Sequence, residues 1–140
     1  MWEEDKPKWI TLRNKAIKLN LINIGIIGTM GVILDSIFLR DSTMSTSIPE
    51  YSTIFIHFFF CMMVEGILFY VFHKVGHLYL YKYHKIHHEF HVPTPLATTY
   101  FHPIDYILGV VIPFAAGPKL LAREIHILTL MFWYVLCYEG

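Results

Sequence analysis

Residues 72–91 read FHKVGHLYLYKYHKIHHEFH and contain six of the nine histidines of the chain. Five of the six, the box histidines, fall at helical spacing in two groups: His73 and His77, then His84, His87 and His88. The members of each group share one face of a helix. One straight helix over this stretch would place its ends about 27 Å apart, too far for a single small metal site. The two groups can share a centre only if the chain bends, and we expect a turn within residues 78–83, LYLYKY.

The overall composition is that of a membrane protein. Hydrophobic residues make up 55% of the 140 residues and the mean hydropathy is +0.47, whereas soluble domains are about 45–50% apolar. The chain has room for one domain. Eleven basic and eleven acidic side chains give a formal net charge of zero. The chain therefore has no net positive charge to attract nucleic acid or a strongly acidic substrate, and we expect no nucleic acid partner.

Two long apolar stretches predict transmembrane helices. Residues 19–38 carry one formal charge near their far end, and residues 54–72 are apolar except for a histidine and a glutamate. Both approach the length of about 20 residues that a bilayer-crossing helix needs. The stretch between them, residues 39–53, is polar and rich in serine and threonine, which predicts a connecting loop.

Basic residues predict which way this hairpin faces. Five of them precede the first span, Arg40 alone lies in the loop, and three follow the second span. Because cytoplasmic segments are enriched in lysine and arginine, both ends of the hairpin and the histidine stretch are predicted to face the cytoplasm. The chain then divides into a cytoplasmic amphipathic N-terminal segment, residues 1–18, and a membrane domain, residues 19–140.

Two further apolar pieces follow the histidines, residues 106–121 and 125–138, and each is shorter than a comfortable span. The first piece also contains Pro113 and Pro118. We therefore expect a re-entrant or interfacial hairpin here. The predicted fold class is an all-α integral membrane protein with two transmembrane helices, a cytoplasmic histidine-rich helical region and a C-terminal apolar helical hairpin.

The box histidines are the predicted metal ligands. Gathering imidazoles on one helical face has little packing benefit and suits metal binding directly. Three further side chains are expected beside the ligands rather than on the metal: Glu65, His91 and His102. Glu65 is included because a carboxylate inside a predicted span is costly and tends to be functional.

The donor set alone leaves the metal open, since imidazole suits zinc, copper, iron and nickel. Lys74 stands where the zinc-protease motif needs a glutamate, so that motif lacks its general base here. The Glu-x-x-His pairs of soluble di-iron bundles do not occur in the sequence. A site just under the bilayer surface is well placed to oxidise an aliphatic lipid. Unactivated C–H bonds need O₂ and a redox-active metal, which favours iron or copper over zinc.

Box one, HKVGH at residues 73–77, and box two, HKIHH at residues 84–88, resemble the histidine motifs of the membrane fatty acid hydroxylase/sterol desaturase superfamily. The downstream stretch YFHPID, residues 100–105, is similar as well. The resemblance covers residues 50–138, and within the superfamily the chain looks most like the sterol C4-methyl oxidases.

This resemblance implies a di-iron centre held by the box histidines, with O₂ as oxidant and electrons from NAD(P)H through cytochrome b5 or a reductase. It implies a multi-pass protein of the endoplasmic reticulum membrane whose histidine boxes face the cytoplasm and whose substrate is a sterol or another lipid. Methyl oxidases, desaturases and fatty acid hydroxylases share these boxes, so the resemblance leaves the reaction open among them.

The chain also departs from the family pattern. Members continue past position 139 into a third H-x-x-H-H box, and at least eight imidazoles are expected around two irons, whereas this sequence carries two boxes. We therefore expect it to be C-terminally incomplete. Two alternatives follow from that expectation and from the donor set: a catalytically incomplete fragment or paralogue that acts as a non-enzymatic membrane partner, and a zinc-dependent membrane hydrolase.

Overall fold

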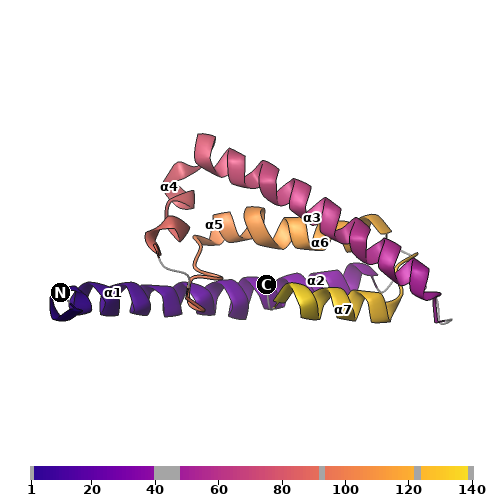
Figure 1. The fold of residues 1–140 in the computed structure, drawn as a ribbon, viewed down its shortest axis with the longest axis horizontal. Coiled ribbons are helices and arrows are strands. Elements are labelled where there is room, and N and C mark those ends of the chain that lie inside the picture. The colour runs from indigo at the N-terminus through magenta and orange to yellow at the C-terminus, as the bar shows by residue number, and fades with distance from the viewer. Residues whose placement is uncertain (1, 40–47, 92–93, 122–123, 139–140) are drawn as a thin grey trace.

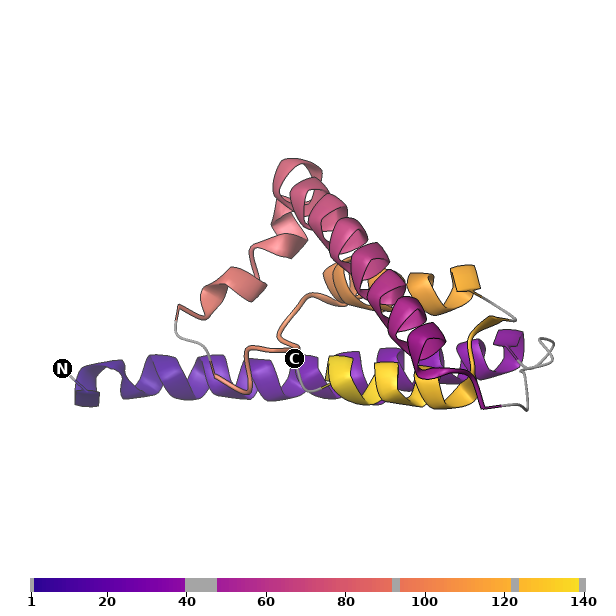
Figure 2. The ribbon, with the colours of Figure 1, turned by 45° about the vertical axis from the view of Figure 1, so that its right-hand side comes forward.

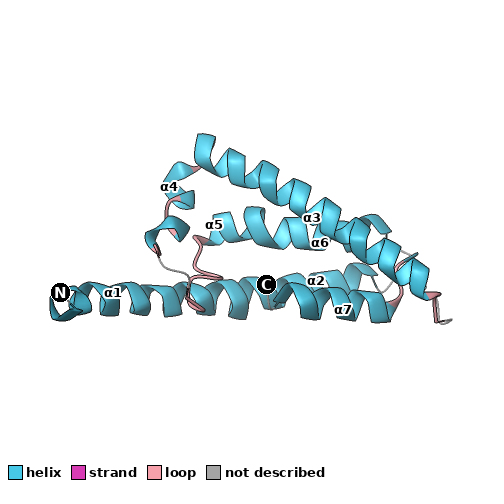
Figure 3. Cartoon of the chain, viewed as in Figure 1, coloured by secondary structure: helices cyan, strands magenta, loops and turns pink. Residues whose placement is uncertain are grey.

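The computed structural model describes residues 2–39, 48–91, 94–121 and 124–138, and every regular element in these ranges is a helix (Figure 3). The helices are α1 (Trp2–Asn20), η1 (Leu21–Gly28), α2 (Thr29–Leu39), α3 (Tyr51–Tyr79), α4 (Tyr81–His84), η2 (His87–Glu89), α5 (Pro103–Tyr106), η3 (Ile107–Val111), α6 (Ile112–Leu121) and α7 (Ile127–Tyr138). The predicted all-α fold class is confirmed.

The first three elements form one long helix, because α1, the π-helical η1 and α2 follow one another without a break. This helix runs along most of the length of the molecule (Figure 1). The predicted division between residues 18 and 19 therefore falls inside a continuous helix. The middle of the predicted loop, residues 40–47, lies outside the described residues, while residues 48–50 are not helical.

The helix α3 contains the whole second predicted span and continues through the first pair of histidines. Its 29 residues correspond to about 43 Å, which exceeds the bilayer core of about 30 Å. Large apolar side chains are exposed along it, among them Phe55, Phe59 and Ile67. An exposed apolar surface of this kind fits a lipid environment rather than water.

In the part of the chain that the structure describes, three helices are long and apolar enough to cross a membrane, where the sequence predicts two. They are Lys8–Leu34, Tyr51–Tyr79 and Pro103–Leu121. The first two overlap the predicted spans, and the third contains the first half of the predicted hairpin. That half is longer than expected because its helix begins at Pro103, before the apolar piece itself. His102 caps the start, since the backbone N–H of Ile104 donates to its Nδ1 at 3.2 Å.

Prolines do not end this third helix. The π-helical turn η3 ends at Val111, two residues before Pro113, and Pro118 lies inside α6. A π-helical turn changes the hydrogen-bond register locally, and helices with membrane-span character tolerate proline where neighbouring helices support them. Both prolines are buried against the rest of the molecule. The helix can therefore continue to Leu121, which the sequence prediction did not allow.

The helix α7 runs back in the opposite direction to α6 (Figures 1 and 2). The buried Trp133 anchors it, because its indole Nε1–H donates to the carbonyl of Phe114 at 3.1 Å and the two rings stack with centroids 5.6 Å apart. Trp133 belongs to a small apolar core with Cys61, Ile125 and Leu130. The predicted apolar helical pair is therefore present, with its first member long enough to be a span.

The helices α3 and α6 approach each other closely at Gly117. A Cβ atom at this position would lie 2.7 Å from the Cα of Cys61 and 3.1 Å from its Sγ. Small residues allow such close backbone approach between membrane helices. The packing of the third helix against the second therefore depends on the absence of a side chain at Gly117.

We predict that Gly117→Ala separates these helices and destabilises the protein, because the added methyl group meets backbone rather than a flexible side chain. Overpacking of this kind costs about 1–3 kcal/mol. Thermal unfolding in detergent, followed by circular dichroism, measures the effect. Gly109→Ala is the matched control in the same helix, since a Cβ there meets nothing within 4 Å. Equal melting temperatures for the two variants would contradict this packing.

Candidate metal centre

The chain reverses direction at Leu80. The helix α3 ends at Tyr79, Leu80 adopts φ −119° and ψ 24°, and α4 begins at Tyr81. The turn predicted within residues 78–83 is confirmed. This reversal brings box two back against the last turns of α3 (Figure 1).

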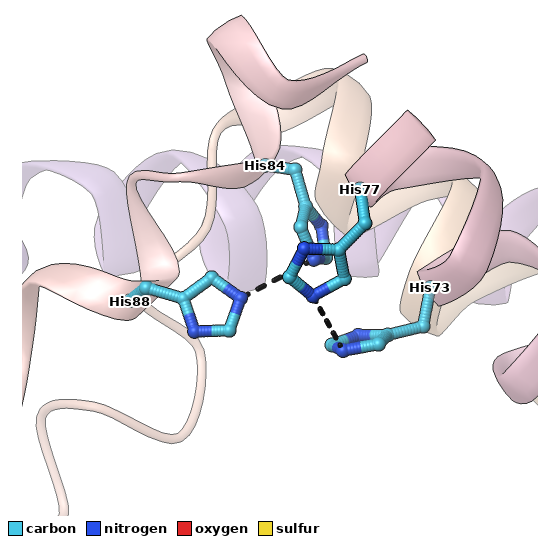
Figure 4. Close-up of side chains that lie close together, drawn as sticks. All are labelled: His73, His77, His84 and His88. Atoms are coloured by element: carbon cyan, nitrogen blue, oxygen red, sulfur yellow. Dashed lines mark hydrogen bonds between the residues drawn. The ribbon is translucent and has the colours of Figure 1, made fainter. Parts of the chain in front are cut away.

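The five box histidines lie together after the reversal. Ring centroids are 4.8 Å apart between His73 and His77, 4.5 Å between His77 and His84, and 4.3 Å between His84 and His87. The ring of His88 lies 4.0 Å from that of His87 and 5.0 Å from that of His77. Two segments that are separate in the sequence thus contribute to one imidazole cluster (Figure 4).

The nitrogen spacings within the cluster fit a shared metal ion. The Nε2 atoms of His73 and His77 are 3.2 Å apart, and those of His84 and His88 are 3.4 Å apart. Two nitrogens bound to one metal at about 2.1 Å lie about 3.0–3.4 Å apart in octahedral or tetrahedral geometry. These four histidines each offer a ligand atom within 4.8 Å of the others. The residues present therefore fit a transition metal with imidazole ligands.

The lowered pKa of His88 suits it to act as a metal ligand. Desolvation among the other rings, and then the positive charge that His87 and His84 carry when protonated, lowers its pKa from 6.5 to about 4. The ring is therefore a neutral imidazole at neutral pH. Only the neutral form has a lone pair to offer to a metal.

His84 lies at the centre of the cluster and rests on the backbone of Gly76. A Cβ at Gly76 would lie 2.6 Å from Nδ1 of His84 and 2.9 Å from its Cγ. The imidazole of His84 is only 2% exposed, so it has no space to move aside. Gly76 was not a predicted site residue. Its signal in the sequence is a helix-disfavouring glycine inside box one, directly before His77.

Asp105 is a second site residue that the sequence prediction missed. It is 8% exposed and lies in the first turn of α5. Its Oδ1 accepts from Nδ1 of His84 at 2.9 Å, and its Oδ2 accepts from Nδ1 of His87 at 3.2 Å. The available signal was a carboxylate two residues after the His-Pro step, at the start of an apolar segment.

The three residues expected beside the ligands lie at different distances from the cluster. His102 caps α5, the helix that carries Asp105, and its ring lies 4.5 Å from that of Tyr83. His91 is exposed, and Glu65 is partly buried on α3. Among the described residues neither of these two makes a hydrogen bond or an ion pair. Within the described ranges, no hydrogen bond, ion pair or ring contact joins any of the three to a box histidine, although His102 acts on the position of Asp105.

Glu89, directly after box two, forms a salt bridge with the first helix. Its carboxylate accepts from Nζ of Lys15 at 2.7 and 2.8 Å and from the hydroxyl of the buried Tyr100 at 2.7 Å. Burial alone would raise the pKa of Glu89, but these two hydrogen bonds outweigh it and lower that pKa. Burial, followed by the bond to Glu89, raises the pKa of Tyr100 to about 12. Tyr100 therefore stays protonated and donates at physiological pH.

Comparison with known proteins agrees with the geometry. The family model for fatty acid hydroxylase matches residues 58–140, which is more than half of the chain. The chain is 28% identical over 132 residues to fatty acid hydroxylase ahd1 of Mycosarcoma maydis, over 91% of this chain and 34% of that protein.

Two plant proteins are similar over a shorter range. The chain is 33% identical over 94 residues to methylsterol monooxygenase 2-2 of Arabidopsis thaliana. It is 34% identical over 94 residues to very-long-chain aldehyde decarbonylase GL1-11 of Oryza sativa subsp. indica. Both matches cover 66% of this chain and 34% of the relative.

The chain thus spans about a third of the length of each of these three relatives. No solved structure matches it. The family match includes both histidine boxes and Asp105, and the superfamily resemblance predicted from the boxes is confirmed. The chain belongs to the fatty acid hydroxylase family.

Proposed function

We propose that this chain is the metal-binding part of a membrane oxygenase that oxidises a C–H bond of a sterol or another lipid. The observation that carries the proposal is the convergence of five imidazoles from α3 and the segment after it on one centre. The apolar helix Tyr51–Tyr79 carries His73 and His77 in its last turns, and the apolar helix Pro103–Leu121 carries Asp105 in its first turn. A polar metal site at the end of lipid-exposed helices suits a substrate that stays in the bilayer.

The box histidines would hold iron. His73, His77, His84 and His88 form the group whose nitrogens lie within 4.8 Å of one another, and His87 adjoins it. Bound there, iron would supply the activation of O₂ that an unactivated C–H bond requires. The resemblance to the superfamily implies two irons, and the five box histidines would provide part of their ligands.

The helix α3 would deliver the substrate. Its exposed apolar side chains face the lipid, and its length exceeds the hydrocarbon core, so its last turns with His73 and His77 would reach the membrane surface. A lipid moving laterally along α3 then reaches the cluster without entering water. The positive residues before the first span and after the second favour a cytoplasmic position for the cluster.

Family resemblance adds the electron source and the location. We infer that NAD(P)H supplies electrons through cytochrome b5 or a reductase at the cytoplasmic face of the endoplasmic reticulum. Lys82 lies just before box two, Lys85 lies within it, and both are exposed, so an acidic electron-transfer protein could dock there by charge complementarity.

A 4-methyl sterol is the proposed substrate class, because the motifs resemble the sterol C4-methyl oxidases and a methylsterol monooxygenase is among the similar proteins. The test is to express the full-length protein that contains this sequence in membranes with an NAD(P)H-dependent reductase and cytochrome b5, measure iron per chain, and follow 4-methyl sterols and long-chain fatty acids by mass spectrometry. Oxidised sterol is the expected product. Iron binding with oxidation of the fatty acid only would retain the family activity and reject the sterol. Iron binding with no lipid oxidised would reject the catalytic role.

We predict that His87→Ala lowers the iron content and abolishes iron-dependent lipid oxidation, because it removes an imidazole from the cluster and a hydrogen bond from Asp105. Elemental analysis of purified protein and the lipid assay measure the two effects. His57→Ala is the control, since His57 lies on α3 sixteen residues before the first box histidine. Unchanged iron content and turnover in His87→Ala would remove His87 from the ligand set.

We predict that Gly76→Ala also reduces metal binding, although it changes no ligand. The new methyl group would displace the ring of His84 and separate the two boxes. Binding of Co²⁺, followed by its visible absorption, should weaken while the helix content stays the same. The control is Gly66→Ala in the same helix, where a Cβ meets nothing within 4 Å. Co²⁺ affinity equal to that of Gly66→Ala would show that the boxes do not pack as described.

A further inference from the structure

Asp105 is positioned to hold two ligand histidines with one carboxylate. The preceding residues fix its place: His102 caps α5, Pro103 occupies the first turn, and Asp105 follows in that turn. Each carboxylate oxygen has a separate partner, His84 Nδ1 at 2.9 Å and His87 Nδ1 at 3.2 Å. The carboxylate and the ring of His84 are both buried, so water does not compete for these bonds.

The two hydrogen bonds determine which ring nitrogen is available to a metal. An ionised carboxylate only accepts hydrogen bonds, so Nδ1 of each histidine must carry the proton. In a neutral imidazole the lone pair is then on Nε2. Nε2 of His84 faces Nε2 of His88 at 3.4 Å, which means that its lone pair points into the cluster.

We propose that Asp105 is a positioning residue that fixes the tautomer and the ring orientation of both His84 and His87. The proposal rests on the proposed function, since it assumes that these rings bind the metal. Metal-ligating histidines generally donate their second N–H to a carboxylate or carbonyl, and loss of that partner lowers metal affinity by about 10- to 100-fold. Here one carboxylate serves two ligands, and it comes from the third membrane helix rather than from the histidine region.

Direct ligation by Asp105 is the competing arrangement, because Asp105, His84 and His87 also offer ligand atoms within 4.8 Å of one another. A metal between these atoms would have to replace the protons on the two Nδ1 atoms. Positioning keeps those protons and uses the Nε2 atoms instead. The two arrangements therefore predict different tautomers and different metal stoichiometry.

The first test measures the tautomers without any metal. Nitrogen-15 NMR of the metal-free protein in detergent micelles, with histidine labelling, distinguishes Nδ1–H from Nε2–H rings. We expect Nδ1–H for His84 and His87 in the unmodified chain. The Nε2–H tautomer at His84 would overturn the inference whether or not the protein is an oxygenase, and the result is independent of the lipid assay.

The second test measures Co²⁺ binding in variants. Asp105→Asn keeps one acceptor but presents an N–H₂ donor to the other histidine, which inverts the tautomer of that ring. We expect it to lower Co²⁺ affinity by about 10- to 100-fold with the helix content retained. Asp105→Leu removes both acceptors at similar size and should lower the affinity further.

Glu50→Gln is the control, because Glu50 is also a hydrogen-bonded carboxylate but its partner is Ser52 at the start of α3, away from both boxes. It should leave the Co²⁺ affinity unchanged. Wild-type affinity in Asp105→Asn would overturn the inference. Loss of one equivalent of Co²⁺, with the remainder bound as in the unmodified chain, would also overturn it in favour of direct ligation.

Discussion

The ring of His84 rests directly on the backbone of Gly76, and the geometry of the histidine cluster depends on that contact. A residue without a side chain lets box two approach the last turns of α3 to van der Waals distance. His84 then lies within 5 Å, centroid to centroid, of rings in both boxes. Because His84 also bonds to Asp105, the same contact connects the second helix, the turn after it and the third helix.

The features that the sequence predicted are those set by short-range patterns. Apolar length identified the first two spans, helical spacing placed each group of histidines on one face, and the separation of the groups required the turn found at Leu80. The third span was missed because the apolar run was counted from its first apolar residue. Its helix starts earlier, at a cap supplied by His102, and passes Pro113 after a π-helical turn. Neither effect is visible in hydropathy alone.

The site residues that sequence patterns did not predict are those whose role depends on contacts with segments distant in the sequence. Asp105 lies 21 residues from His84 and 18 from His87 in the sequence. These separations are too long for helical spacing to relate Asp105 to either histidine. The rule that selected Glu65, a carboxylate within an apolar helix, applies equally to Asp105, the carboxylate of the third span. Burial and hydrogen bonds separate the two: Asp105 is buried between two histidines, whereas Glu65 is only partly buried.

The first helix stabilises the irregular backbone that connects box two to Asp105. Ala16, Asn20 and Asn23 lie at spacings of four and three on one face of that helix. The amide of Asn20 donates to the carbonyl of Leu96, and the fully buried amide of Asn23 donates to the carbonyls of Thr99 and Phe101. Non-helical backbone near a bilayer is tolerated only where protein groups satisfy its carbonyls. Two asparagines near the start of the first apolar span therefore support the loop that brings Asp105 to the histidines.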